Sequence, residues 1–454
     1  MVKREKDGGK PIRPARILVA GFLSMIAVGT LLLSLPISSS TGRSIPLIDA
    51  LFTSTSAVCV TGLITKNTAT DFSLFGKVVI LLLIQAGGLG YMTLSTIISL
   101  LIGKRISLRD RLIMAEAYNV LSLEGLVRFT KTIFTITVSL EIIGATILFF
   151  NWLPQMGPKD AAFHAVFQAV SAFNNAGFSS FPDNLARFQG DVTVNLTIIL
   201  LIVLGGIGYI VISDLYRFFT GQVVRLSFHT KVVLVATGIL ITGGTLLFLL
   251  VEGGNPGSLA GLPFHRKVMV SLFQSVTTRT AGFNTVDVGR LAYPTLFAFI
   301  LLMFIGASPG GTGGGIKTST FSVMCTALWC TMRGQRDTTL FRREIPPEMV
   351  ARSFFIGTSA MFFIVAGTAV VLLVEKGPLI STLFECVSAF GTVGLSTGNG
   401  GNLSLVANFG PIGKLMIIIL MFTGRLGPLT IGSAFIYKGE VRVYKYPEGK
   451  ILVG

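Results

Sequence analysis

Long apolar runs alternate with shorter apolar segments along the whole sequence, and charged positions fall between them. Runs of roughly 20 residues can cross the hydrocarbon core of a bilayer, whereas apolar segments of about 12 residues are typical of re-entrant or interfacial helices. Eight long runs and four short segments recur in the order long, short, long. The pattern therefore predicts an all-α integral membrane protein with eight transmembrane helices.

Each of four successive repeats is expected to hold a first spanning helix, a short helix, a loop and a second spanning helix. We expect the first spanning helices over 15–37, 126–151, 230–251 and 349–374, and the second ones over 72–103, 190–219, 292–332 and 407–437. The first to fourth repeats then occupy 15–103, 126–219, 230–332 and 349–437, between a cytoplasmic N-terminus at 1–14 and a cytoplasmic C-terminal tail at 438–454.

Two glycine motifs recur in register in the four repeats, and they predict pseudo-fourfold symmetry around a central pore. The first motif ends in a glycine followed by Leu or Phe, and these glycines lie 105 to 115 residues apart. A Phe precedes this glycine by ten residues, or by nine in the third repeat. The first-motif glycines are Gly62, Gly177, Gly282 and Gly394, and the second motifs, 24 to 30 residues later, are Gly87–Gly90, Gly205–Gly208, Gly306–Pro309 and Gly424–Gly427.

Composition supports a membrane protein, and the distribution of charge indicates its orientation. Hydrophobic residues make up 51% of the chain and charged residues 13%, against about 25% charged in an average soluble domain. The net charge is +16, but 26 of the 37 Lys and Arg residues fall at the termini, in the linkers 104–125, 220–229 and 333–348, and at the adjoining helix ends. By the positive-inside rule these parts are cytoplasmic. We therefore expect contacts with anionic membrane lipids and no nucleic acid partner.

Sequence motifs of enzymes are missing from the chain. The three histidines, His164, His229 and His265, are far apart, and no phosphate-binding loop, zinc-protease motif or serine-nucleophile motif occurs. The four cysteines lack the spacing of a zinc site and are better explained as small buried thiols. We therefore expect no enzyme activity and no cofactor in this chain.

The first-motif loops are candidates for a site that binds a dehydrated cation. Irregular backbone at membrane depth survives only inside protein or along a wet cavity, and four such loops on one axis would surround an ion with carbonyl oxygens. The loops are almost uncharged, which favours a monovalent cation over a divalent one, although tight helix packing is an alternative role for the glycines. Arg279 is expected to point behind the loop and donate hydrogen bonds to carbonyls. The candidate selectivity-filter residues, whose backbone carbonyls would hold the ion, are Val60, Thr61, Gly62, Asn175, Ala176, Gly177, Thr280, Ala281, Gly282, Thr392, Val393 and Gly394.

Two features on the cytoplasmic side of these loops are candidate gates. Repeat symmetry places the second residue of the second motif near the axis, and the fourth repeat has Arg425 there. This guanidinium would repel cations; alternatively it is turned aside into a buried pair with Glu141. In the third repeat a proline and five glycines interrupt the second spanning helix, which favours an unwound gate, with a permanent kink as the alternative. The candidate gate residues are Arg425, Ser308, Pro309, Gly310, Gly311, Thr312, Gly313, Gly314, Gly315 and Lys317.

Several of these stretches resemble the Trk/Ktr/HKT superfamily of potassium transporters, and are most similar to the bacterial KtrB-type membrane subunit. They are Asn174–Phe178, Arg279–Phe283, Ser388–Leu395 and Gly424–Thr430, and the resemblance extends from about Pro14 to the C-terminus. It implies that the four first-motif glycines are filter glycines and that K⁺ is the transported ion. It also implies sodium-stimulated uptake, with Na⁺ as an activator, in a bacterial plasma membrane. The implied partners are a second copy in a homodimer and a cytosolic KtrA-type regulatory ring that binds nucleotides.

Two further functional classes remain open at this stage. An obligatorily coupled sodium– or proton–potassium symporter is the main alternative, but such carriers often have inverted repeats, whereas these four repeats all run the same way. A membrane scaffold or receptor would not need four glycine loops. A gated, channel-like pore is therefore the favoured expectation.

Overall fold

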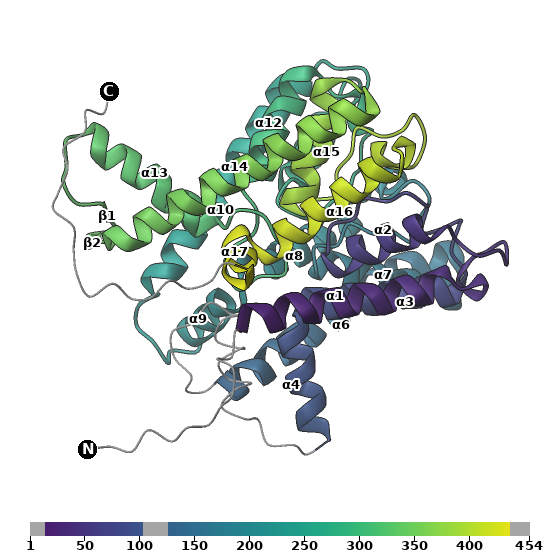
Figure 1. The fold of residues 1–454 in the computed structure, drawn as a ribbon, viewed down its shortest axis with the longest axis horizontal. Coiled ribbons are helices and arrows are strands. Elements are labelled where there is room, and N and C mark those ends of the chain that lie inside the picture. Colours follow the sequence, from purple (N-terminus) through teal and green to yellow (C-terminus); the bar gives the residue numbers. More distant parts are fainter. Residues whose placement is uncertain (1–13, 103–125, 436–454) are drawn as a thin grey trace.

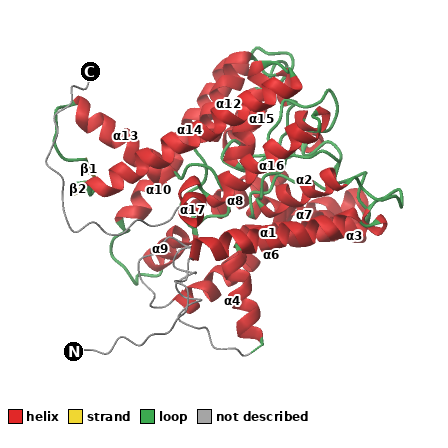
Figure 2. Ribbon diagram, viewed as in Figure 1, coloured by secondary structure: helices red, strands yellow, loops and turns green. Residues whose placement is uncertain are grey.

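The computed structural model describes residues 14–102 and 126–435, and these fold mainly into helices (Figures 1 and 2). Residues 1–13, the expected linker 104–125 and the expected tail 438–454 lie outside the described residues. Within the described residues, four helices are long and apolar enough to cross a membrane, or up to six spans if each of two bent helix pairs counts as one. The four helices are α1 (Pro14–Ser34), α6 (Leu126–Met156), α10 (Phe228–Glu252) and α14 (Pro347–Glu375).

A short helix follows each long one and starts at a proline. Proline fixes φ near the helical value and needs no hydrogen-bond acceptor in the first turn, so it begins a helix without penalty. Pro46, Pro263 and Pro378 are the residues just before three of these helices, and Pro158 is the first residue of the other. The short helices are α2 (Leu47–Val58), α7 (Pro158–Phe173), α11 (Phe264–Thr277) and α15 (Leu379–Gly391).

The second long element of every repeat is broken, whereas the sequence predicted an interruption only in the third. Gly90, Gly208 and Gly427 end α3, α8 and α16 with positive φ angles of 81°, 97° and 83°, a conformation that glycine adopts without strain. The chain bends by 102° after α8 and by 94° after α16. The helix pairs are α3 (Leu74–Leu89) with α4 (Tyr91–Leu101), α8 (Val192–Ile207) with α9 (Tyr209–Phe219), α12 (Tyr293–Phe304) with α13 (Thr318–Met332), and α16 (Pro411–Leu426) with α17 (Pro428–Phe435).

The four repeats close into a ring. Helices α3, α8 and α12 each pack against the short helix of the following repeat, α7, α11 and α15, and α16 packs against α2 of the first repeat. Lys414 of α16 forms an ion pair of 2.8 Å with Asp49 of α2. Arg16 Nε of α1 donates a 2.7 Å hydrogen bond to the carbonyl oxygen of Ala434 in α17. The beginning and the end of the described chain are thus joined directly.

The apolar core lies around the short helices. The phenylalanines that precede the first-motif glycines are almost completely buried, which explains why they recur with the repeat: Phe52, Phe167, Phe273 and Phe384. Four single-turn helices also occur, η1 (Pro36–Ser38), η2 (Ala186–Phe188), η3 (Val288–Arg290) and η4 (Leu405–Asn408). The strands β1 (Thr339–Leu340) and β2 (Arg343–Glu344) form a small antiparallel hairpin between α13 and α14, with Thr339 opposite Glu344 (Figure 1).

Candidate functional site

The four first-motif loops share one backbone conformation. Two residues before each glycine stands a non-glycine residue with a positive φ: Val60 at 57°, Asn175 at 58°, Thr280 at 66° and Thr392 at 49°. The glycines also have positive φ angles, between 70° and 93°. Left-handed conformations are rare for residues with a side chain, and a β-branched residue such as Val60 is a clear outlier. The same strain at the same position in four loops marks a backbone shape that the fold holds in place.

These loops meet one another in a closed ring. A Cβ atom added to each first-motif glycine would lie closer than 3.0 Å to the carbonyl oxygen of the residue before the glycine of the neighbouring repeat. Gly62 faces Ala176, Gly177 faces Ala281, Gly282 faces Val393, and Gly394 faces Thr61. The order returns to its start after four steps, so the four carbonyl oxygens surround one centre. The structure thus brings together the twelve candidate filter residues, three from each loop.

Hydroxyl groups of the short helices hold the loops in this shape. Ser56 and Ser388 accept hydrogen bonds of 3.0 Å from the backbone N–H groups of Gly62 and Gly394. In the other two repeats, Ser171 and Thr277 donate hydrogen bonds of 2.6 Å to the carbonyl oxygens of the residues after the glycines. A hydroxyl residue five or six positions before each glycine was visible in the sequence, but its function becomes clear only from these contacts.

A cavity of about 230 Å³ opens on one side of the ring. All four first-motif glycines line it, together with the carboxylates Asp183 and Asp287 and the side chains of several asparagines. No lysine or arginine is among the described residues that line it. A mouth with two acidic groups and no basic group favours the approach of cations.

The first glycine of the second motif lets the second long element of a repeat approach the C-terminal end of the short helix in three of the repeats. A Cβ atom added to Gly87, Gly205 or Gly424 would overlap the carbonyl oxygen four residues before the first-motif glycine of the same repeat. The third repeat is different, since Gly306 packs against Gly314 of its own loop. Close packing within one repeat therefore explains the first glycine of the second motif in three repeats. The first-motif glycines differ, because their close contacts are with the neighbouring repeat.

The irregular segment between α12 and α13 lies against the second and fourth repeats. Ser308 N and Thr312 N donate hydrogen bonds of 2.9 Å and 3.1 Å to the carbonyl oxygens of Gly206 and Gly205, respectively, and Gly315 N donates one of 3.2 Å to Gly424. A further bond of 2.9 Å runs from the N–H of Gly314 to the hydroxyl of the candidate filter residue Thr392. Lys317 Nζ donates a hydrogen bond of 2.7 Å to the Gly313 carbonyl within the segment. The candidate gate segment 308–315 is therefore hydrogen-bonded to both neighbouring repeats.

Arg425 reaches across this region and forms no pair with Glu141. Its guanidinium donates hydrogen bonds to the carbonyl oxygens of Thr312 in the third repeat and Gly87 in the first. Since the ring order is first, second, third, fourth, these two acceptors belong to opposite repeats. Glu141 instead accepts hydrogen bonds from Asn174, at 2.9 Å, and Gln85, at 3.2 Å.

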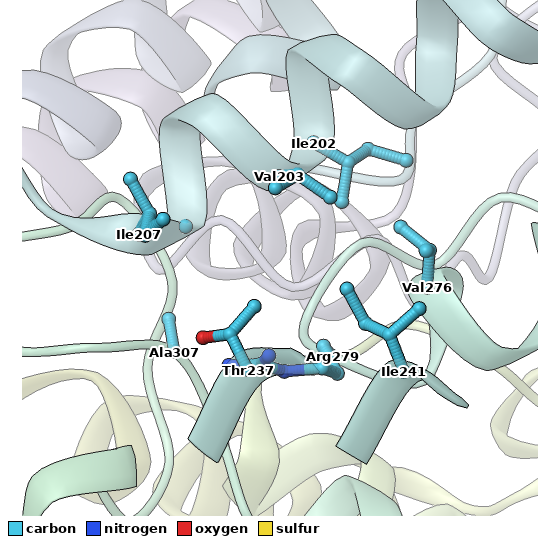
Figure 3. Close-up of a pocket in the computed structure, with 9 residues that line it drawn as sticks. Ile202, Val203, Ile207, Thr237, Ile241, Val276, Arg279 and Ala307 are labelled. Carbon is cyan, nitrogen blue, oxygen red and sulfur yellow. The ribbon is translucent and has the colours of Figure 1, made fainter. Parts of the chain in front are cut away.

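Arg279 does not form the hydrogen bonds expected of it. Its side chain is 8% exposed and its buried Nε has no partner. It lines a small cavity together with residues of α8 and α10 (Figure 3). None of the four first-motif glycines lines this cavity. Nothing in the sequence pattern distinguishes this arrangement from the expected bracing role.

Comparison with known proteins identifies the family. A family model for cation transport proteins of the TrkH type matches residues 14–440, which include both motifs in all four repeats. The chain belongs to the TrkH family of cation transport proteins. This confirms the resemblance to the Trk/Ktr/HKT superfamily. With several long apolar helices, this TrkH-family chain is a multi-pass membrane protein.

Similar proteins cover almost the entire length of this family member. The chain is 40% identical to the Ktr system potassium uptake protein B of Bacillus subtilis, over 97% of each chain. It is 39% identical to the protein of the same name from Vibrio alginolyticus, over 100% of this chain and 97% of that one. The potassium/sodium uptake protein NtpJ of Enterococcus hirae is 35% identical over 100% of both. The crystal structure of the potassium transporter TrkH from Vibrio parahaemolyticus has the same fold, with a TM-score of 0.73 and 19% identity over 96% of this chain and 87% of that one.

In residues 14–102 and 126–435, no group of three or more His, Cys, Asp and Glu side chains could hold a metal ion. The four cysteines are free.

Proposed function

We propose that this protein takes up potassium ions across the membrane through a gated, channel-like pore. The observation that carries the proposal is the closed ring of carbonyl oxygens from Thr61, Ala176, Ala281 and Val393. The names of the relatives, which are potassium uptake proteins, support the choice of ion. Inside the ring, K⁺ would exchange its hydration shell for carbonyl oxygens of the candidate filter residues.

The short helices would help to make the ring selective for cations. Each of α2, α7, α11 and α15 ends directly before a filter loop, so the partial negative charge of its C-terminus lies close to the ion. The strained backbone at Val60, Asn175, Thr280 and Thr392 would keep the carbonyl oxygens in a fixed direction before an ion arrives. Such a site binds the ion through partial charges and not through a carboxylate. It would therefore hold a monovalent ion weakly enough to release it.

The candidate gate would close the path below the filter. Arg425 contacts opposite repeats through Thr312 and Gly87, so its charge would lie across the ion path. One of these acceptors belongs to the segment 308–315, and moving that segment would therefore break the contact. We propose that opening withdraws both together, with Lys317 as the point where the segment joins α13.

The proposed assembly extends beyond this single chain. We propose eight membrane crossings in which each broken second element counts as one, with the chain ends on the cytoplasmic side. The hydrogen bond between Arg16 and Ala434 supports placing the two ends of the described chain on the same side. The relatives' designation as part of a Ktr system supports a partner subunit. We propose a homodimer, a cytosolic nucleotide-binding KtrA-type ring, and stimulation by Na⁺.

Uptake measurements would test this proposal. The gene would be expressed in a bacterium that lacks its own potassium uptake systems, with and without a regulatory subunit, and K⁺ and Na⁺ uptake would be measured. Saturable K⁺ uptake that needs no fixed number of co-transported Na⁺ or H⁺ ions supports the pore. A constant ratio of K⁺ to Na⁺ or H⁺ at every gradient would instead establish the coupled symporter, and no K⁺ uptake would refute the proposal.

A further inference from the structure

A buried positive charge without a partner lies beside the third filter loop. Arg279 stands three residues before the filter glycine Gly282 and is only 8% exposed. Among the described residues, no side chain forms an ion pair with it, and its Nε has no hydrogen-bond partner. The C-terminal end of α11 supplies only a partial negative charge. A buried guanidinium in this state lacks the counter-charge that such groups normally have.

The second repeat shows how the same place is filled when a polar residue stands there. Asn174 is also three residues before its filter glycine, and its side-chain amide donates hydrogen bonds to Glu141 Oε1, at 2.9 Å, and to Gln85 Oε1, at 3.0 Å. A carboxylate from α6 and an amide from α3 thus surround this position. The position beside the second loop therefore has polar partners from both the first and the second repeat.

Beside the third loop, aliphatic residues of the second and third repeats stand in place of both partners. Glu141 lies three residues before Gly144, which packs against a leucine of α8, and Ile241 lies three residues before Gly244, which packs against a leucine of α12. In the same way, Gln85 is two residues before the second motif of its repeat, and Val203 holds that place in the next one. Arg279 therefore lines a cavity with Ile241 and Val203. At the corresponding place in the second repeat, Asn174 instead contacts the Glu141 carboxylate and the Gln85 amide.

The space left by this replacement is a cavity of about 20 Å³ (Figure 3). In the view of Figure 3, Ile202, Val203 and Ile207 lie along one side, and Arg279 and Thr237 lie on the other. The Thr237 hydroxyl is buried and also has no hydrogen-bond partner. A cavity needs roughly 10–15 Å³ to hold one water molecule. This cavity therefore has room for one water molecule or one small ion.

We propose that this cavity binds one small inorganic anion, such as chloride, between the Arg279 guanidinium and the Thr237 hydroxyl. Both groups can donate a hydrogen bond, and the guanidinium supplies the charge. A water molecule of the same size would satisfy the donors but leave the charge uncompensated in aliphatic surroundings. A bound anion neutralises it, and so removes a repulsion from the adjacent filter loop.

Thermal unfolding in two potassium salts tests the site without reference to transport. The purified full-length protein would be melted in potassium chloride and in potassium gluconate at equal K⁺ concentration, because gluconate is too large for the cavity. Chloride should raise the melting midpoint by about 2 °C, the size of shift that a ligand at roughly ten times its Kd gives a protein of this length. Equal midpoints in the two salts would overturn the proposal.

Variants of two residues make the test specific to the cavity. Arg279→Gln should abolish the difference between the salts, whereas the parent keeps it. Ile241→Glu copies the carboxylate of the second repeat and should give the same midpoint in both salts; Ile241→Gln, which adds no charge, should still respond to chloride. If Arg279→Gln fails to fold, the two Ile241 variants still decide, and an undiminished chloride response in Ile241→Glu would contradict the proposal.

Diffraction from crystals grown in bromide locates the anion directly. The anomalous signal of bromide should give one peak in contact with the Arg279 guanidinium. A cavity without a bromide peak, in crystals whose other bromide sites are visible, would overturn the assignment.

Discussion

Replacing Arg425 with alanine should increase cation flux. Its guanidinium is held between the carbonyl oxygens of Gly87 and Thr312 on opposite repeats. In the proposed pore, a passing ion would therefore approach it to contact distance. Two unit charges about 4 Å apart repel by roughly 4 kcal/mol at an effective dielectric constant of about 20. Since about 1.4 kcal/mol corresponds to a tenfold change in rate, this barrier alone would slow passage on the order of 1000-fold. The next barrier along the path limits the gain, and we expect an increase of at least about tenfold.

The substitution also removes the hydrogen bonds to Gly87 and Thr312. A buried carbonyl left without a donor costs about 1–3 kcal/mol, but a water-filled path allows water to replace the guanidinium. The loss should therefore loosen the segment 308–315 without unfolding the protein, and activity without the regulatory subunit should rise as well.

The assay is flux of K⁺ or Rb⁺ into liposomes containing the purified protein. Arg425→Lys is the matched control: it keeps the charge but loses the planar pair of donors, so its flux should stay closer to that of the parent. Size-exclusion chromatography and a melting curve would show whether each variant is folded. A well-folded Arg425→Ala protein with flux equal to or below the parent would refute the barrier, and a misfolded one would show that Arg425 is structural.

Three further changes test the filter, the gate segment and the ring closure. Serine at any first-motif glycine, for example Gly62→Ser, should weaken K⁺ affinity or admit Na⁺, because the added Cβ overlaps a neighbouring carbonyl; unchanged uptake kinetics for both ions in all four single variants would rule out the filter assignment. Deleting 308–315 should make flux independent of the regulatory subunit, and an unaltered dependence would place the gate elsewhere. Lys414→Ala leaves the buried carboxylate of Asp49 without its partner, so it should lower the free energy of unfolding by about 3–5 kcal/mol and lower the melting midpoint. The double variant Lys414→Met with Asp49→Asn removes both charges and should lose less stability. Equal losses in the two variants would contradict this reasoning.

The helical character and the four first-motif loops could be predicted because their signals are local and repeated. Apolar length, the prolines that begin the short helices and the spacing of Gly62 and its three counterparts are all readable in one dimension. The breaks at Gly90, Gly208 and Gly427 were missed, because glycines in apolar helices are equally typical of close packing. Only a positive φ distinguishes a break from a packing contact, and the sequence does not carry that angle.

The partners of the buried charges could not be predicted, because they come from distant parts of the chain. The sequence left Arg425 with two possibilities, an axial position or a pair with Glu141, and repeat symmetry alone could not decide between them. Its acceptors are backbone carbonyls more than 100 residues away, and carbonyl positions have no signature in the sequence. Arg279 illustrates the same limit, since the replacement of its polar neighbours becomes visible only when repeats are superimposed residue by residue.

A ring built from one chain can hold a different residue in each quarter. The ion pair between Lys414 and Asp49 joins the last quarter to the first, so the ring is closed without a second subunit. If four identical subunits formed it, Arg425 would occur four times at one level, and four guanidinium groups would crowd and repel one another there. One covalent chain permits a single guanidinium at this level, which one movement would remove in the proposed gating. Mutations in one quarter can also adjust closure while leaving the other three unchanged, a freedom that a symmetric tetramer does not have.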